Sequence, residues 1–284
     1  MKKTGKILTG FLIVVGAMAL REMVSMFQLI AYAGYQIISG KNGTEEVTAS
    51  LNNMVQNTEN LLLISAIGTL VWIMVFGFIY KKQRKIEGKN LFNKKIKVSR
   101  IFVLAFMGMG LQLFINSILG TFLKVAPELM ENYKQLVQSL GMGNSLISLL
   151  YIVVIAPIGE ELVFRGVVEN YMKKHIKFIT ANIFQALFFG IYHMNVVQGI
   201  YAFFLGLLLG WVANKYGSVR ESIILHMAVN LSGCLVGFLL PEVFVNTYVG
   251  LLALFIVSLG MVAFSIKTVK MEKETIEKAS MVEE

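Results

Sequence analysis

Long unbroken apolar segments constrain the fold of this 284-residue chain more than any other feature. Three of them run from Leu61 to Tyr80, from Ile101 to Leu123 and from Tyr248 to Ile266. Each is long enough to cross the roughly 30 Å hydrocarbon core of a bilayer as a helix. A transmembrane β-barrel needs short strands of alternating polarity, and these segments show no such alternation. The sequence therefore predicts helices that span a membrane.

The composition extends this prediction to the whole chain. Hydrophobic residues make up 56% of it and charged residues 15%, and the mean hydropathy is +0.68. About eight spans of about 20 residues account for that apolar fraction. We expect an all-α polytopic membrane protein that forms a single domain over residues 1–284. The expected spans lie near residues 7–35, 60–80, 101–123, 145–171, 178–193, 199–214, 221–240 and 248–266.

The basic residues predict the orientation of these spans. Of the 26 Lys and Arg residues, 21 fall in segments on the side that holds the N-terminus. The opposite side has only Lys41, Lys124 and Lys134. By the positive-inside rule, both termini are expected in the cytoplasm. The net charge of +9 is then explained by topology and anionic lipid, and no nucleic-acid partner is needed.

The N-terminal segment admits two interpretations. Three lysines, an apolar stretch and Ala17-Met18-Ala19 resemble a secretory signal with a cleavage site. Because the apolar stretch continues past Arg21 and Glu22 to Ile38, we favour a retained first span. Arg21 and Glu22 are adjacent and point to different helix faces, so we expect no internal ion pair and assign them no function.

Several chemistries are excluded by missing residues. The single cysteine, Cys234, forbids an intramolecular disulfide and a thiolate zinc cluster. All 17 acidic residues are Glu, so an aspartyl dyad is impossible. The chain also has no His-Glu-x-x-His motif and no Gly-x-Ser-x-Gly motif.

Ionisable residues within the fourth span need a reason, because a charge at mid-bilayer costs roughly 2.5 to 3.5 kcal/mol. Glu161 and Arg165 are four residues apart on one helix face and can pair. Glu160, turned about 100° away, is left free for chemistry. Pro157 removes a backbone hydrogen bond and can open the helix just before it. A purely structural ion pair is the alternative interpretation.

Two further polar pairs lie in later spans. Phe189 and His193 end the fifth span, and His226 and Asn230 share a helix face in the seventh. Taken singly, each is explained by interfacial or helix-helix hydrogen bonding. Together with Glu160 they offer a carboxylate, two imidazoles and a carboxamide, a minimal set for activating water and stabilising an oxyanion.

These residues resemble the CPBP family of intramembrane proteases, which includes type II CAAX prenyl endopeptidases and Abi-type bacteriocin-processing and self-immunity proteins. The family pattern is Glu-Glu-x-x-x-Arg, Phe-x-x-x-His and His-x-x-x-Asn on successive helices. The chain carries all three in order, starting at Glu160, Phe189 and His226. The resemblance covers a core of roughly residues 145–240, preceded by three further spans and followed by one.

The resemblance implies an intramembrane endopeptidase of eight helices. Glu160 and His193 would activate water, and His226 and Asn230 would hold the oxyanion. Glu161, Arg165 and Phe189 would support them. Glu160, His193 and His226 could instead hold a catalytic zinc ion, and the sequence leaves both mechanisms open, although we favour the metal-free one.

The expected substrate is a membrane-associated peptide or lipidated protein, and the expected location is a bacterial plasma membrane. A non-catalytic scaffold or bacteriocin immunity protein of the same fold is the main alternative, and a small transporter that uses Glu160 and Glu161 is a second one.

The distances of the site residues from the nearest basic residue at a helix end do not agree. At the rise of an α-helix, Glu160 lies about 20 Å from Lys173, whereas His226 lies only about 9 Å from Arg220. A shared site therefore requires tilted or extended helices, and a separation of Glu160 and His226 beyond about 10 Å would count against it.

Overall fold

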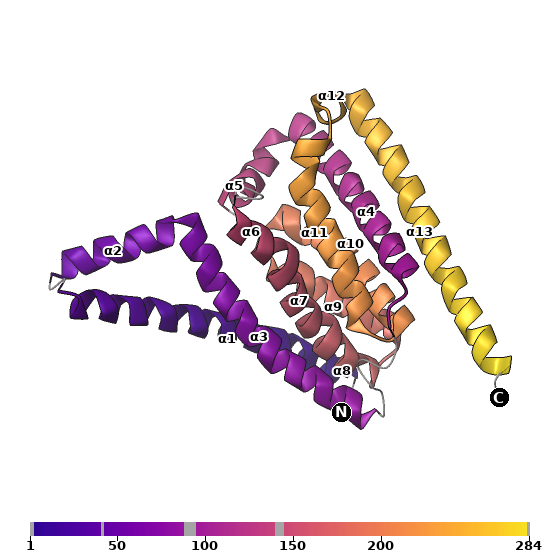
Figure 1. Cartoon of the computed structure of the whole chain (residues 1–284), viewed down its shortest axis with the longest axis horizontal. Coiled ribbons are helices and arrows are strands. Elements are labelled where there is room, and N and C mark those ends of the chain that lie inside the picture. The colour runs from indigo at the N-terminus through magenta and orange to yellow at the C-terminus, as the bar shows by residue number, and fades with distance from the viewer. Residues whose placement is uncertain (1–2, 41–42, 88–94, 140–144, 283–284) are drawn as a thin grey trace.

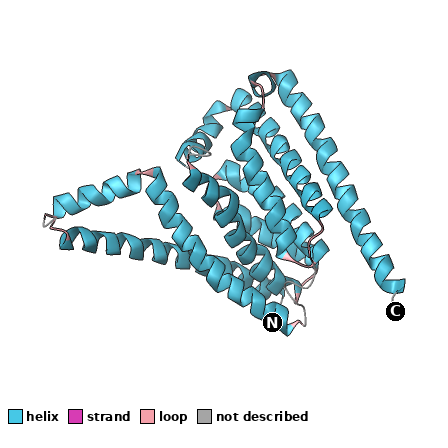
Figure 2. Cartoon of the chain, in the orientation of Figure 1, coloured by secondary structure: helices cyan, strands magenta, loops and turns pink. Residues whose placement is uncertain are grey.

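The computed structural model describes residues 3–40, 43–87, 95–139 and 145–282. Every element in these ranges is helical, and none is a strand (Figures 1 and 2). Seven helical segments are long and apolar enough to cross a membrane. These findings confirm an all-α polytopic membrane protein. The expected eighth span is the apolar helix α9 (Phe178–Tyr192), whose 15 residues make it shorter than the other seven.

Three helices form the N-terminal part of the chain. They are α1 (Lys3–Ile38), α2 (Thr44–Gln56) and α3 (Thr58–Ile86). The helix α1 continues without a break through the signal-like Ala17 to Ala19. The helices α1 and α3 diverge from the rest of the bundle and are joined by α2 at their far ends (Figure 1). A hydrogen bond from the Trp72 indole to the Ala17 carbonyl, 2.7 Å long, ties α3 to α1.

The next elements lead into the centre of the bundle. They are α4 (Val98–Val125), η1 (Pro127–Met130), α5 (Glu131–Ser139) and a helical segment over Leu146–Lys173. That segment consists of α6 (Leu146–Leu150), η2 (Tyr151–Ile155), α7 (Ala156–Glu161), η3 (Leu162–Glu169) and α8 (Asn170–Lys173), of which η2 and η3 are π-helical. The Ser145 hydroxyl caps its start by accepting from the Ser148 amide.

The remaining helices are α9, α10 (Val196–Tyr216), α11 (Val219–Leu239), α12 (Glu242–Asn246) and α13 (Tyr248–Val282). Side chains of Asn195 and Ser218 cap α10 and α11, and Gly217 ends α10 in a left-handed conformation, with φ of 65°. As expected, the C-terminal tail continues the last helix. The described structure adds α2, η1, α5 and α12, short helices in segments that had been expected only as connections between spans.

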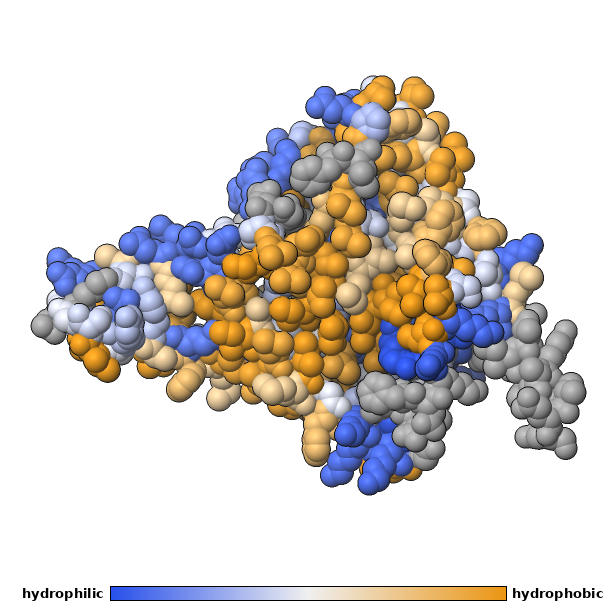
Figure 3. All heavy atoms as spheres, viewed as in Figure 1, coloured by the Kyte–Doolittle hydropathy of each residue, from blue (hydrophilic) through white to orange (hydrophobic). Residues whose placement is uncertain are grey.

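Two large apolar clusters, and a smaller third one of Ile152, Val153 and Cys234, hold the helices together. One large cluster joins α1, α3, η3 and α9 around Trp72, Phe164 and Phe189, and the other joins α4, α10 and α11 around Leu104, Leu209 and Leu225. The outward face of α3 exposes Leu63, Ile67, Leu70, Met74 and Phe78. Apolar side chains cover the middle of this side of the molecule, and hydrophilic ones gather toward its ends (Figure 3). Such a continuous apolar surface suits contact with lipid.

The two chain ends lie toward the same edge of the molecule, where α3 also ends (Figure 1). This arrangement is what an even number of crossings produces. That this edge faces the cytoplasm stays a prediction from the charge distribution.

Candidate active site

The backbone around Pro157 departs from a regular α-helix, as the sequence predicts. In η2 the Ala156 amide bonds to the Tyr151 carbonyl, five residues earlier. In the same register the Ile152 carbonyl would pair with residue 157, but proline has no N–H. The Asn230 side-chain amide of α11 fills that place by donating to the Ile152 carbonyl over 2.8 Å. One of the proposed catalytic residues therefore also seals an opening in the helix that carries Glu160. π-Helical turns of this kind are frequent at functional sites.

Glu161 and Arg165 form the ion pair expected from their spacing. Arg165 Nη1 lies 2.8 Å from Glu161 Oε1, and both side chains are fully buried. The other guanidinium arm donates to the Gly206 carbonyl of α10. The guanidinium carbon lies 4.4 Å from the centroid of the Phe189 ring, close enough for a cation–π contact. The pair thus ties η3 to α9 and α10.

His226 lies between the two glutamates. Its Nδ1 is 3.0 Å from Glu161 Oε1, and its Nε2 is 3.7 Å from Glu160 Oε2. The first contact is a hydrogen bond, and the second is too long for one. Glu160 and His226 are therefore close neighbours, well within the 10 Å limit set by the sequence argument. Glu161 is bound on two sides, whereas Glu160 keeps a carboxylate oxygen directed at an imidazole without a direct hydrogen bond to it.

His193 ends α9 and presents one ring nitrogen for chemistry. Its Nδ1 lies 2.7 Å from the Phe189 carbonyl. Because a carbonyl only accepts, Nδ1 carries the proton, and in the neutral ring Nε2 is an acceptor. The Phe189 ring contacts both imidazoles, with centroid distances of 4.7 Å to His193 and 5.8 Å to His226. The next residue, Met194, has a left-handed backbone with φ of 54°, a strained conformation for a side chain of this kind.

One cavity of about 440 Å³ collects these groups. Glu160, Phe189, His193, His226 and Asn230 all line it. Glu161 and Arg165 do not line it and lie behind it as support for His226. The structure therefore brings the four proposed catalytic residues to one space, which is large enough for a short stretch of peptide and a water molecule.

The cavity also has a polar lining that the motifs did not indicate. Its members come from helices on both sides of the motif core: Arg21 of α1, Ser65 of α3, Gln112 of α4, Tyr133 of α5, Tyr151 of η2, Tyr192 of α9, and Gln198 and Tyr201 of α10. Arg21 Nη2 lies 3.4 Å from Glu22 Oε1, but the Glu22 side chain is 65% exposed, so this contact is not the internal ion pair that the sequence argued against. A cation within a retained apolar span was the available signal for this residue.

Tyr133 belongs to a connecting helix outside the spanning segments. Its ring meets that of Tyr201 edge to face, with centroids 6.1 Å apart. Burial raises the pKa of Tyr133, so its phenol stays neutral at physiological pH. It adds a hydroxyl to the cavity lining without adding a charge.

The possible zinc ligands can be compared with the observed geometry. Ligand atoms around a tetrahedral zinc ion lie roughly 3 to 4 Å apart. Glu160 and His226 meet this spacing, but the described residues contain no group of three His, Cys, Asp or Glu side chains suited to a metal ion. His193 does not complete a triad in this arrangement. The residues as placed do not fit a three-ligand zinc site, and the metal-free mechanism favoured from the sequence stays a prediction for experiment.

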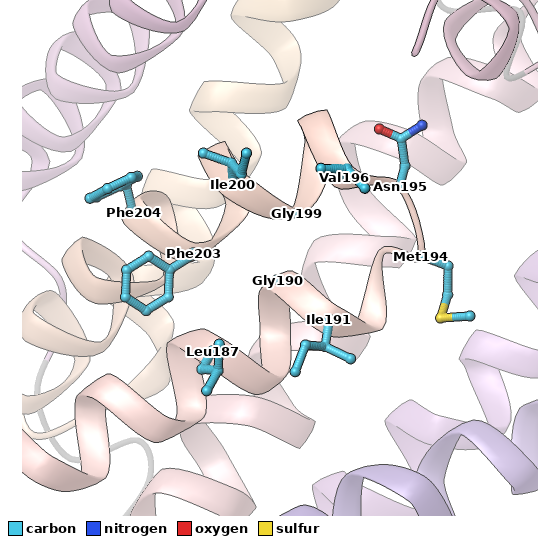
Figure 4. Close-up of a pocket in the computed structure, with 10 residues that line it drawn as sticks. All are labelled: Leu187, Gly190, Ile191, Met194, Asn195, Val196, Gly199, Ile200, Phe203 and Phe204. Atoms are coloured by element: carbon cyan, nitrogen blue, oxygen red, sulfur yellow. The ribbon is translucent and has the colours of Figure 1, made fainter. Parts of the chain in front are cut away.

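A second hollow of about 470 Å³ lies between α9 and α10, away from the charged residues. Gly190 and Gly199 form its floor, and apolar side chains such as Leu187, Ile200 and Phe203 surround it (Figure 4). The two helices approach so closely there that a Cβ atom on Gly190 would lie 2.6 Å from the Gly199 carbonyl oxygen. We assign it no catalytic role.

The fold and the site define a polytopic helical membrane protein in which Glu, His and Asn side chains line one cavity. Residues 142–232 match the family model described as type II CAAX prenyl endopeptidase Rce1-like, so the chain carries a domain of this family. The match confirms the resemblance to the CPBP family. The match supports a CAAX-type intramembrane peptidase at the level of the family. Comparisons with curated proteins and with solved structures gave no match.

Proposed function

We propose that the chain hydrolyses a peptide bond in a membrane-associated substrate, with Glu160 as the general base. The observation that carries the proposal is the approach of Glu160 to His226 within 3.7 Å in a cavity that His193 and Asn230 also line. Glu160 would accept a proton from water while the water oxygen forms a bond to the peptide carbonyl carbon. The Nε2 acceptor of His193 would hold that water.

The second half of the site would bind the negative charge that develops on the carbonyl oxygen. His226 donates Nδ1–H to Glu161 and, in its imidazolium form, has a second N–H at Nε2, which lies 3.7 Å from Glu160 Oε2. Asn230 keeps one amide N–H beyond the one given to Ile152. When the intermediate collapses, the C–N bond breaks and the proton held by Glu160 passes to the leaving amine. Removal of an oxyanion donor typically costs 10²- to 10³-fold in turnover.

The biological setting we propose is peptide maturation or bacteriocin self-immunity in a bacterial plasma membrane. The excess of basic residues on one side of the chain suits such a membrane. A prenylated substrate would require a host that prenylates proteins.

The test compares the membrane and secreted peptides of cells that make the wild type, Glu160→Gln or the control Glu59→Gln at matched levels. Glu59 is an exposed carboxylate in the first turn of α3. New peptide termini should appear with the wild type and Glu59→Gln and disappear with Glu160→Gln. Identical peptides in all three would favour a binding or immunity role without turnover. Purified enzyme treated with a zinc chelator should keep its activity, and loss that zinc restores would establish a metal mechanism instead.

A further inference from the structure

Arg21 is a cation in the active-site cavity that comes from outside the family-matched segment 142–232. Among the described residues that line this cavity, it is the only Lys or Arg. Its side chain is 26% exposed. A charge within an apolar span is costly and calls for a compensating partner or a function.

The guanidinium of Arg21 is held in place by α3 and α9. A Cβ atom on Gly68 would lie 2.9 Å from Arg21 Cγ, so the missing side chain makes room for the arginine stem. The guanidinium carbon lies 5.6 Å from the Trp72 ring centroid and 5.5 Å from that of Tyr192. Arg21 Nη1 donates to the Tyr192 hydroxyl over 2.6 Å. Two rings and one hydrogen bond thus fix the orientation of the charge beside the cavity.

These contacts leave the charge of Arg21 poorly compensated. Tyr192 is a neutral acceptor, and the Glu22 contact is 3.4 Å long to a carboxylate that is 65% exposed. An exposed pair of this kind contributes little. By contrast, Arg165 lies 2.8 Å from a fully buried carboxylate, and Arg100 pairs at 2.8 Å with both Glu221 and Glu272. Arg21 therefore retains N–H donors and charge for a further anionic partner.

We propose that Arg21 binds a carboxylate of the peptide substrate, either the C-terminal carboxylate or an acidic side chain. A guanidinium presents parallel N–H donors that match the two oxygens of a carboxylate. Arg21 and Glu160 line the same cavity of about 440 Å³, which holds only a short stretch of peptide. The carboxylate is therefore expected within a few residues of the bond beside Glu160. This inference rests on the proposed function for the position of that bond.

The test measures binding in the full-length Glu160→Gln protein, so that turnover is not needed. The probe is a pool of apolar hexapeptides of mixed sequence, tagged with a photoreactive benzophenone, in lipid nanodiscs. One form has a free C-terminal carboxylate, a second has a C-terminal amide, and a third has an amide and a Glu as its last residue. The measured quantity is the peptide concentration that gives half-maximal crosslinking.

We expect the free acid, the Glu form or both to bind at least tenfold more tightly than the plain amide. Adding Arg21→Met should remove this difference, Arg21→Lys should keep part of it, and Arg84→Met should leave it unchanged. Arg84 is a matched control because it pairs with Glu87 and does not line the cavity. The form that keeps the advantage identifies the carboxylate as terminal or side-chain.

Equal binding of the three forms, or no binding of any form, would overturn the carboxylate subsite. A difference that survives Arg21→Met in a protein with unchanged thermal unfolding would overturn it as well. If Arg21→Met lowers thermal stability, the Arg21→Lys variant distinguishes the two roles. A purely structural cation–π role predicts that peptide binding does not depend on the carboxylate in this variant, whereas the proposed subsite predicts that part of the dependence remains. Cleavage by the wild type without carboxylate preference rejects only this subsite. Carboxylate preference without any cleavage rejects only the proposed hydrolysis.

Discussion

Arg165→Met should strongly destabilise the protein, because it removes the guanidinium from the fully buried Glu161 carboxylate and leaves His226 as its remaining partner. Breaking a buried ion pair from one side costs about 3 to 5 kcal/mol. The Gly206 carbonyl, which also loses Arg165 as a donor, keeps the Gln185 amide at 2.9 Å. The cost therefore comes mainly from the unpaired charge. At about 2 to 4 °C per kcal/mol for a domain of this size class, the midpoint of thermal unfolding should fall by at least about 6 °C.

The double variant Arg165→Met with Glu161→Gln isolates that charge. The glutamine oxygen can still accept from His226 Nδ1, so the pair should lose only about 1 kcal/mol. Lys174→Met is the control, because its pair with Glu87 is partly exposed and should contribute at most about 1 kcal/mol. Unfolding followed by circular dichroism in detergent gives the three midpoints. A double variant as unstable as Arg165→Met, or a single variant within about 1 kcal/mol of wild type, would refute the reasoning and show that water reaches the pair.

Three further predictions concern the scaffold. Asn230→Leu should lower the free energy of unfolding by about 1 to 3 kcal/mol, because it leaves the Ile152 carbonyl unpaired. Adding Pro157→Ala restores a backbone N–H for that carbonyl, so thermal unfolding of the double variant should show most of the lost stability recovered. Gly108→Ala places a Cβ atom 2.6 Å from a side-chain atom of α11, so it should lower the free energy of unfolding by about 1 to 3 kcal/mol and reduce cleavage. The control Gly260→Ala, whose Cβ atom would have nothing within 4 Å, should change neither quantity. Reporter tags at the two termini should both be protected from impermeant reagents added outside intact cells, and labelling of either would contradict the charge-based topology.

Interactions within one helix could be predicted from the sequence. The Glu161–Arg165 pair follows from a spacing of four residues, and the break before Pro157 follows from the missing N–H. Both depend only on geometry that every helix shares. The approach of Glu160 to His226 was expected from the resemblance to a family, because no local rule places residues 66 positions apart next to each other.

The contributions of neighbouring helices could not be predicted. Arg21 was taken for a residue without function because its partners, Trp72 and Tyr192, are distant in sequence and belong to no motif. The bond from Asn230 to the Ile152 carbonyl was equally hidden, because it depends on the π-helical register of η2. Packing between helices decides such contacts, and a single sequence shows only that a polar group in an apolar span must find some partner.

Basic residues at helix ends predict the orientation of the chain in the membrane, but they do not predict how deep the site residues lie. From Lys173 to Glu160 is 13 residues and from Arg220 to His226 only 6, yet the two site residues lie 3.7 Å apart. Since their depths agree, the segment Leu146–Lys173 must extend about seven residues, or about 10 Å, farther past the site than α11 does, unless the two helices differ in tilt. The positive-inside preference acts on which side a cation lies and not on its distance from the hydrocarbon. An active site in a chain of this kind is therefore better located by side chains that share a helix face than by counting residues from the nearest lysine.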